Sequence, residues 1–175
     1  SKIIKTLNSN CDCYKENMDI SKFIYRISKE IQESSIENPL LVGVPRRGDI
    51  INKKISNQLN NFGYKHQITN VNYTPFRDDL ESKIPKEKMP ISPEGRDVIL
   101  VDDVIYTGRT MRAVTEGVMF SGRPLSVNIA CLVDRGHREV PFSPKFVGKN
   151  LPTSPANHVS VLLKELDGRD EILVN

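Results

Sequence analysis

Residues 98–110 read Val-Ile-Leu-Val-Asp-Asp-Val-Ile-Tyr-Thr-Gly-Arg-Thr, and this stretch decides how the rest of the chain is interpreted. Its first four residues are continuously apolar and mostly β-branched, which is typical of a strand buried on both faces of a parallel sheet. Asp102 and Asp103 follow where we expect that strand to end, at its carboxyl edge. Ligands of open α/β sheets bind outside that edge, so the order of strand and carboxylate pair predicts a binding site.

The turn at residues 107–110, Thr-Gly-Arg-Thr, supplies hydroxyl groups and closely spaced backbone N–H groups at the start of an expected helix. Unpaired N–H groups and the helix dipole favour an anion at such a position. Carboxylates that end a strand often only cap the next helix, and Thr-Gly is an ordinary turn. Because all parts occur in register, we favour a site for a ligand that carries a phosphate and a diol.

This stretch resembles the 5-phosphoribosyl-1-pyrophosphate (PRPP) loop of type I phosphoribosyltransferases. The resemblance implies that the two aspartates hold the ribose hydroxyls, with Asp103 as a catalytic residue, and that the turn binds the 5-phosphate. The PRPP- and nucleotide-binding residues that it implies here are Asp102, Asp103, Val104, Tyr106, Thr107, Gly108, Arg109 and Thr110.

Length and composition agree with a globular protein of one domain. The chain has 175 residues, of which 38% are hydrophobic and 27% charged. Residues 1–18 are polar and aperiodic, so we expect a loose leader before a single domain at residues 19–175. No apolar run approaches the ~20 residues that span a membrane, and no signal peptide is evident, so we expect a cytoplasmic protein without a membrane partner.

Net charge, cysteines and histidines give no sign of a nucleic-acid-binding, disulfide-rich or metal-binding protein. The net charge of +3 is too small to indicate nucleic-acid binding by itself. Three cysteines, the pair Cys11 and Cys13 and the isolated Cys131, give no disulfide framework. The three histidines are distant in sequence, so we expect no metal ion held by direct protein ligation.

The hydrophobic pattern predicts alternating helices and strands. A helix is expected from the N-cap Asp19, because apolar residues then recur at helical spacing: Ile20, Phe23, Ile24, Ile27 and Ile31. The other expected elements are strands at 40–44, 67–73, 125–133, 159–163 and 172–174, a helix capped by Asp49 that ends near 61–63, and a helix at 109–121. This alternation predicts a parallel sheet flanked by helices.

A basic turn follows the first expected strand and therefore lies at the same edge as the aspartates. It reads Val44-Pro45-Arg46-Arg47-Gly48. Forked arginine donors and a glycine that allows close backbone approach suit a highly charged leaving group, although an exposed basic turn is the simpler reading. The turn resembles the family's pyrophosphate-binding loop, which implies contacts from Arg46, Arg47 and Gly48. Most relatives have threonine where this chain has Arg46.

Residues 74–96 form a long polar segment with four prolines, and segments of this length are usually functional lids or disordered. Its motif Phe76-Arg77-Asp78-Asp79-Leu80 resembles the family's mobile lid, which implies a catalytic role for Arg77. A lid would keep water from the reacting ribose. A charged loop is more often just solvated, and that alternative stays open.

Residues 132–139 and 147–154, together with the loops above, resemble the bifunctional pyrimidine operon attenuation regulator and uracil phosphoribosyltransferase family over roughly residues 19–174. The resemblance implies a type I phosphoribosyltransferase fold in the α/β class, with a small hood and a base pocket bordered by Arg135 and Val159. It implies conversion of uracil and PRPP to UMP and pyrophosphate with substrate-bound Mg²⁺, binding of UMP or UTP, and a homodimer or higher homo-oligomer. The alternatives are an RNA-binding attenuator with little catalytic activity and a phosphoribosyltransferase for another base.

For RNA, the resemblance implies five residues that can contact a pyrimidine-operon leader: Arg26, Lys29, His137, Arg138 and Lys149. The match is partial, because Tyr25, Lys29, Ser34 and Ser143 differ from the residues of RNA-binding relatives. Segment 15–37 is net negative despite its basic stripe. We therefore expect weaker and less specific RNA binding than in those relatives, because phosphate contacts supply much of the affinity.

Overall fold

The computed structural model describes residues 18–79 and 83–175, so the expected leader, with Cys11 and Cys13, lies almost wholly outside the described residues. A five-stranded sheet with the order β2-β1-β3-β4-β5 forms its centre, and all neighbouring strands are parallel. The strands are β1 (Leu40–Gly43), β2 (Gln67–Asn70), β3 (Asp97–Ile105), β4 (Ser126–Asp134) and β5 (Phe146–Asn150). The parallel sheet predicted from the sequence is confirmed.

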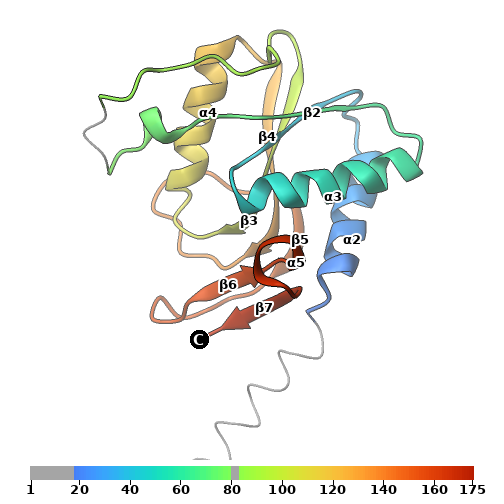
Figure 1. The fold of residues 1–175 in the computed structure, drawn as a ribbon, viewed down its shortest axis with the longest axis vertical. Helices are drawn as coiled ribbons and strands as arrows, with labels where there is room; N and C mark the ends of the chain where they lie inside the picture. Colours follow the sequence, from blue (N-terminus) through green and yellow to red (C-terminus); the bar gives the residue numbers. More distant parts are fainter. Residues whose placement is uncertain (1–17, 80–82) are drawn as a thin grey trace, which may run out of the picture.

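Helices cover both faces of this sheet, as Figure 1 shows. The helices α2 (Ile20–Glu33) and α3 (Arg47–Asn61) pack against the face that presents Leu41, Ile99 and Val101. The helix α4 (Arg109–Ser121) packs against the opposite face, which presents Val42, Val98 and Leu100. Because successive strand residues point to opposite faces, the unbroken apolar run at residues 98–101 supplies side chains to both cores.

The first helix forms as its periodicity predicts. Asp19 is the N-cap, and its Oδ1 accepts a hydrogen bond from Ser21 N at 2.9 Å. At the other end, Ser34 N–H donates to the Ile31 carbonyl at 3.1 Å. The apolar residues predicted for the inner face are all buried: Ile20, Phe23, Ile24, Ile27 and Ile31.

The second helix begins earlier than expected, and the prediction that Asp49 caps it is wrong. Helix α3 starts at Arg47, and Asp49 lies in its first turn. The reason is tertiary packing at Gly48, where a Cβ atom would come within 2.6 Å of the Val101 carbonyl oxygen. The helix therefore packs its first turn directly on β3. A carboxylate in the first turn, such as that of Asp49, still stabilises the helix by its interaction with the positive end of the helix dipole.

Several strand boundaries also differ from the sequence-based expectation. β2 ends at Asn70 and not at residue 73, and β4 begins one residue late, leaving Leu125 73% exposed. β3 extends to Ile105 because it pairs with β4 up to Asp134. The edge strand β5 was not predicted, because its mixture of glycine and polar residues gives no strand signal of its own.

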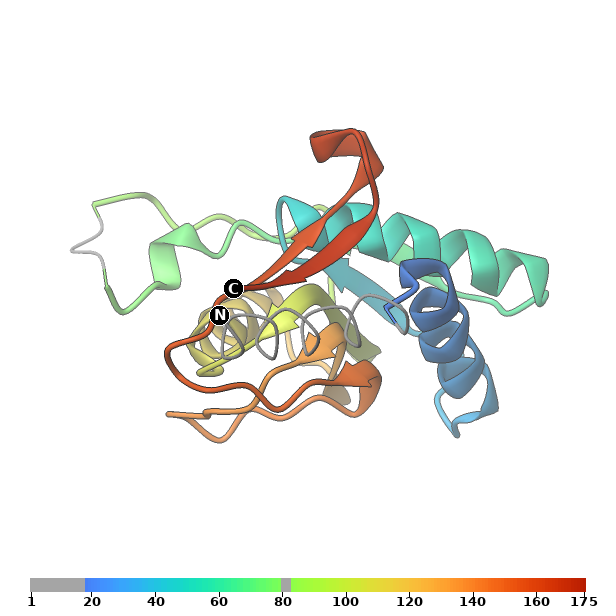
Figure 2. The ribbon, with the colours of Figure 1, turned by 90° about the horizontal axis from the view of Figure 1, so that it is seen from below.

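A small hood follows the sheet in sequence. Its strands β6 (Val159–Leu162) and β7 (Glu171–Val174) are antiparallel and enclose the short helix α5 (Lys164–Asp167), which the sequence did not predict. Figures 1 and 2 show α5 at the tip of the hood, next to the beginning of α3. Apolar hood residues, including Val161 and Leu163, complete the core beside α2 and α3. Across the described ranges, no helix is long and apolar enough to cross a membrane.

Candidate functional site

Four loops meet at the carboxyl edge of the sheet, because parallel strands all end on the same side. β3 lies at the centre of the sheet, between β1 and β4. The loop after β3 is therefore flanked by the basic turn after β1 and by residues 135–139 after β4. The loop after β2 lies beside the basic turn.

The carboxylate pair lies inside β3 and not beyond its end. Asp102 is buried, and its Oδ1 accepts a hydrogen bond from Asp103 N at 2.8 Å. Burial, and then the neighbouring Asp103 carboxylate, raise the pKa of Asp102 well above its ordinary value. Asp103 is only partly buried, and its Oδ1 accepts from Val104 N at 2.7 Å. The two aspartates are thus unequal: Asp102 is buried with a raised pKa, and Asp103 is the more accessible carboxylate.

The turn after β3 forms a pocket of about 170 Å³ at the start of α4. Gly108 is the helix N-cap with φ 87°, a conformation that glycine adopts without the strain of a side chain. Thr107 Oγ1 accepts a hydrogen bond from Arg109 N at 3.3 Å. The pocket is lined by Asp102, Val104, Ile105, Tyr106, Thr107, Gly108, Thr110 and Met111. The structure thus brings most of the residues predicted to bind PRPP around one pocket.

Arg109 is not among the residues that line this pocket. Its Nη1 donates to Asp78 of the lid segment at 2.7 Å, and its Nε donates to Glu139 after β4 at 3.0 Å. In this conformation the Arg109 side chain joins the lid segment to the β4–β5 loop.

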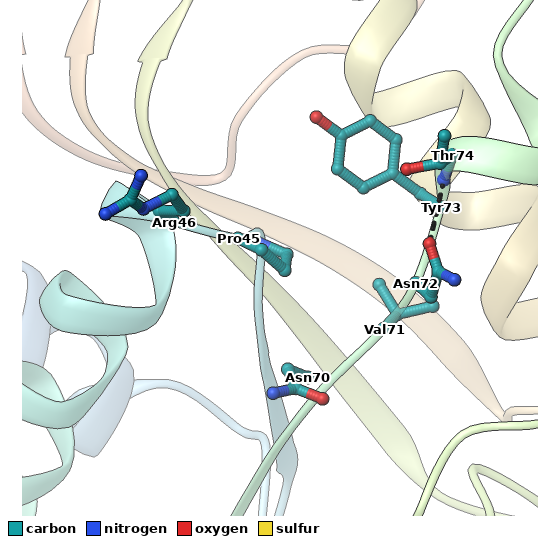
Figure 3. A pocket seen from close by; sticks show the side chains of 7 residues that line it. All are labelled: Pro45, Arg46, Asn70, Val71, Asn72, Tyr73 and Thr74. Atoms are coloured by element: carbon teal, nitrogen blue, oxygen red, sulfur yellow. Dashed lines mark hydrogen bonds between the residues drawn. The ribbon is translucent and has the colours of Figure 1, made fainter.

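The two arginines of the basic turn have different surroundings. The peptide bond between Pro45 and Arg46 is cis, and Arg46 is exposed. Figure 3 shows Arg46 across a pocket of about 290 Å³ from the loop after β2. Arg47 instead forms a two-point ion pair with Asp167 of the hood, at 2.6 and 3.2 Å. Gly48 is buried against β3, where a Cβ atom would come within 2.6 Å of the Val101 carbonyl oxygen.

Sequence reasoning missed Tyr73, which lines the pocket of Figure 3. Its side chain is partly buried, and burial followed by the nearby Asp102 carboxylate raises its pKa. The position of Tyr73 just after a parallel strand is the signal that could have identified it, because loops that follow such strands border the ligand-binding edge of the sheet. The expected strand at 67–73 includes Tyr73, whereas β2 ends at Asn70 and leaves Tyr73 in the following loop.

The lid segment begins at a short 3-10 helix, η1 (Thr74–Phe76), whose Phe76 is buried against α4. Arg112 of α4 donates to the Phe76 carbonyl at 2.5 Å. The next residue, Arg77, is exposed and pairs with Asp79, with Nε 2.8 Å from Oδ1. Leu80, the last residue of the predicted lid motif, lies outside the described residues.

Arg135 is fixed at the end of β4. Its guanidinium carbon lies 4.0 Å from the centre of the Tyr106 ring. Its Nη2 donates to the carbonyls of Ser154 at 3.2 Å and Asn157 at 2.7 Å. Arg135 also lines a pocket of about 280 Å³ with Asp134, Gly136, His137, Asn150, Pro152 and Thr153. Val159, which we also expect to border the base pocket, does not line this pocket and belongs to the core cluster with other hood residues.

The residues expected to contact RNA are largely engaged within the chain. Arg26 pairs with Glu30 at 3.2 Å, and Lys29 pairs with Glu33 at 3.7 Å. Arg138 donates to Asp134 at 2.7 Å and to the carbonyls of Tyr106 and Phe142, both at 2.8 Å. The His137 ring donates to the Thr153 carbonyl and lies edge-on to Tyr106. Lys149 lies on β5, next to Gly148, whose carbonyl accepts from Arg26 at 3.4 Å.

Two remaining predictions concern metal and thiol chemistry. Among residues 18–79 and 83–175, no group of three or more histidine, cysteine or acidic side chains is arranged to hold a metal ion. Cys131 is buried on β4, and burial raises the pKa of its thiol well above the ordinary value. Its thiol is therefore protonated and packs as a small core residue.

Comparison with known proteins gives consistent results. The phosphoribosyl transferase domain model matches residues 10–165. A bifunctional protein PyrR of Fusobacterium nucleatum is 39% identical over 163 residues, covering 89% of this chain and 92% of the relative. The bifunctional protein PyrR of Streptococcus suis is 41% identical over 162 residues, covering 91% and 94%.

Solved structures support the fold alone. The hypoxanthine phosphoribosyltransferase of Trypanosoma cruzi superposes with a TM-score of 0.65 at 19% identity, over 89% of this chain and 90% of that chain. A hypoxanthine-guanine phosphoribosyltransferase of Bacillus anthracis gives 0.61 at 16% identity, over 76% and 77%.

Proposed function

Because the chain belongs to the phosphoribosyltransferase family, and within it to the bifunctional PyrR proteins, we propose that it converts uracil and PRPP to UMP and pyrophosphate. The observation that carries this proposal is the pocket at the start of α4. Asp102 and the phosphate-type turn line it together, Asp103 follows Asp102 directly in β3, and the loop after β1 with its two arginines ends at the same edge of the sheet.

The chemistry needs no nucleophile from the protein. A nitrogen of uracil attacks the anomeric carbon of the ribose while the bond to pyrophosphate breaks. Catalysis of this kind depends on positioning and on charge stabilisation. Asp103 accepts hydrogen bonds from ribose hydroxyls, the turn at 107–110 holds the 5-phosphate through backbone N–H groups, and Arg46 and Arg47 offset the charge that develops on pyrophosphate.

The donor set also fits a Mg²⁺ ion that arrives with the substrate. Mg²⁺ typically takes one or two carboxylates together with substrate phosphates and water. Asp103, the accessible carboxylate of the pair, lies beside the expected position of the ribose and would hold the ion through the substrate and its bound water. Bound there, the ion would neutralise charge on the pyrophosphate oxygens.

The choice of uracil rests on the β4–β5 region and is tested by comparing bases. Arg135 stacks on Tyr106 and borders a pocket with residues 150–153, the segment whose sequence resembles the uracil-specific family. The assay supplies labelled uracil, orotate, hypoxanthine and guanine in turn, with PRPP and Mg²⁺. We expect product with uracil only. Product with a purine and none with uracil would contradict the proposed specificity.

Regulation through RNA is a second candidate function, because the relatives carry the name bifunctional. In this proposal UMP or UTP occupies the nucleotide site of a homodimer or higher homo-oligomer, and a basic face binds a pyrimidine-operon leader. The ion pairs of Arg26 and Lys29 with neighbouring glutamates weaken that face for phosphate contacts. We therefore rank the enzyme function above RNA binding.

A further inference from the structure

The hood contacts α3 through two ion pairs that come from the same short helix. Asp167 of α5 pairs with Arg47 in the first turn of α3, with 2.6 Å between Oδ2 and Nη1. Glu165 of α5 pairs with Lys54, two turns further along α3, at 2.7 Å. Only the first pair reaches the basic turn after β1.

We propose that Asp167 is a positioning residue for pyrophosphate: it holds the Arg47 guanidinium at the ligand edge and thereby couples the hood to the leaving-group site. This inference rests on the proposed function, in which Arg47 contacts pyrophosphate. It assigns a role in that contact to a hood residue that lies 120 positions away in the sequence.

The geometry favours positioning over a chance surface pair. The ion pair uses two nitrogens of Arg47 and both carboxylate oxygens of Asp167. The carboxylate is itself fixed, because Asp167 Oδ2 also accepts from the Leu163 backbone N–H at 2.8 Å. Two-point pairs of this kind set the orientation of a guanidinium as well as its distance. Both side chains are also partly shielded, at 34% and 21% exposure.

The Arg47 guanidinium belongs to the first residue of α3, in the basic turn that follows β1 at the carboxyl edge of the sheet. Besides Asp167, the carboxylate that stabilises its charge is Asp103, the accessible member of the acid pair. The Arg47 cation therefore pairs with a carboxylate of the hood and also interacts electrostatically with the carboxylate proposed to bind ribose. The pair with Asp167 uses only part of the guanidinium's donor set, which leaves other N–H groups for a phosphate oxygen.

A fixed arginine binds an anion more tightly than a mobile one. A free arginine side chain loses rotamer entropy when it is immobilised by a ligand, which reduces the affinity. The ion pair with Asp167 immobilises the Arg47 side chain before pyrophosphate binds. Loss of the Arg47–Asp167 pair should therefore weaken the binding of PRPP and pyrophosphate, and should affect the binding of uracil much less.

The Lys54–Glu165 pair provides the matched control. It joins the same two helices but ends away from the basic turn, so it tests whether the ion pairs merely attach the hood. The variants are Asp167→Asn, Glu165→Gln and Asp167→Glu. Thermal unfolding of each variant establishes that the fold is retained.

Two measurements on the full chain test the inference. Calorimetric titration with PRPP and Mg²⁺ should show a roughly tenfold loss of affinity in Asp167→Asn, as for one charge-assisted hydrogen bond. Affinity should be unchanged in Glu165→Gln and partly restored in Asp167→Glu. Steady-state kinetics in both directions should show the same rise in KM for PRPP and pyrophosphate, with KM for uracil unchanged.

Equal effects of Asp167→Asn and Glu165→Gln, or an effect on the KM for uracil alone, would overturn the positioning role and leave a simple hood anchor. The result also separates the inference from the proposed function. If the natural chain binds PRPP but does not transfer its phosphoribosyl group to uracil, the proposed function fails. Calorimetry with PRPP still compares the Asp167 and Glu165 variants in that case. If it binds no PRPP, both fail.

Discussion

At the scale of single residues, the acid pair shows how burial divides two identical side chains into different roles. Asp102 is buried with a raised pKa, whereas Asp103 remains accessible to a ligand. The more informative substitution is therefore Asp103→Asn. One charge-assisted hydrogen bond contributes ~1.5–3 kcal/mol, so we expect a roughly ten- to hundredfold loss of kcat/KM with the fold intact.

Asp97→Asn is the control for this substitution. Asp97 begins the same strand, at the edge opposite to the site, and accepts a hydrogen bond from Ser126 Oγ at 2.6 Å. Steady-state kinetics of both variants give the comparison. Near-normal turnover in a folded Asp103→Asn protein would argue against the ribose contact.

Asp102→Asn should stabilise the unliganded protein at neutral pH. The folded-state pKa of Asp102 is raised, so ionisation costs stability once the pH exceeds the unfolded value of about 3.9. That cost is absent below this pH, where both states are protonated. Asparagine keeps the acceptor for Asp103 N–H and removes the charge.

We expect the melting temperature of Asp102→Asn to exceed that of the natural chain by a few degrees at pH 7, because ~1 kcal/mol corresponds to roughly 2–4 °C in a domain of this size. The difference should shrink as the pH falls toward 4. Calorimetry across this range measures it. A difference that stays constant with pH would show that the charge of Asp102 is not its cause.

At the scale of elements, the lid segment is anchored at both ends, and the described residues between them, 77–79 and 83–88, are exposed. Phe76 and Met89 are buried, while Arg77 is exposed and pairs with Asp79. If the segment closes over the substrate, Arg77→Ala should lower kcat several-fold with little change in fold stability, because a surface ion pair stabilises little.

Lys88→Ala provides the comparison within the same segment, since Lys88 is also an exposed cation. Full kinetics with PRPP varied separate an effect on kcat from one on KM. If Arg77→Ala and Lys88→Ala both behave like the natural chain, the segment is a solvated loop and not a lid.

At the scale of the whole molecule, the distribution of ion pairs bears on how strongly the chain binds RNA. Arg26 and Lys29 are paired with glutamates, and Arg138 is held by three acceptors within the chain. We expect weak binding of the pyrimidine-operon leader, with a shallow dependence on salt, because few cations are available to phosphate.

Titration of the leader at several salt concentrations, with and without UMP, measures this binding. Lys149→Gln is a better probe than Arg138→Ala, because Arg138 supports the loop after β4 and its loss would disturb the base pocket. Tight binding that UMP strengthens and that Lys149→Gln abolishes would reverse the ranking of the two functions.

The sequence by itself determined the features that depend on neighbouring residues. Helical periodicity predicted α2, the apolar run at residues 98–101 predicted a strand buried on both faces, and the Thr-Gly turn predicted the start of α4. These predictions succeed because hydrophobic periodicity and turn-forming residues depend on only a few neighbouring positions. The order of acid pair and turn likewise located the central pocket, since both belong to one stretch of chain.

The tertiary structure alone decided what depends on distant segments. Packing of Gly48 against Val101 set the start of α3 before Asp49, and pairing with β4 extended β3 through the acid pair. Burial made Asp102 and Asp103 unequal, and the hood placed Asp167 on Arg47. A pattern of neighbouring residues carries no information on these contacts, because they form only when segments far apart in the chain pack together and exclude water.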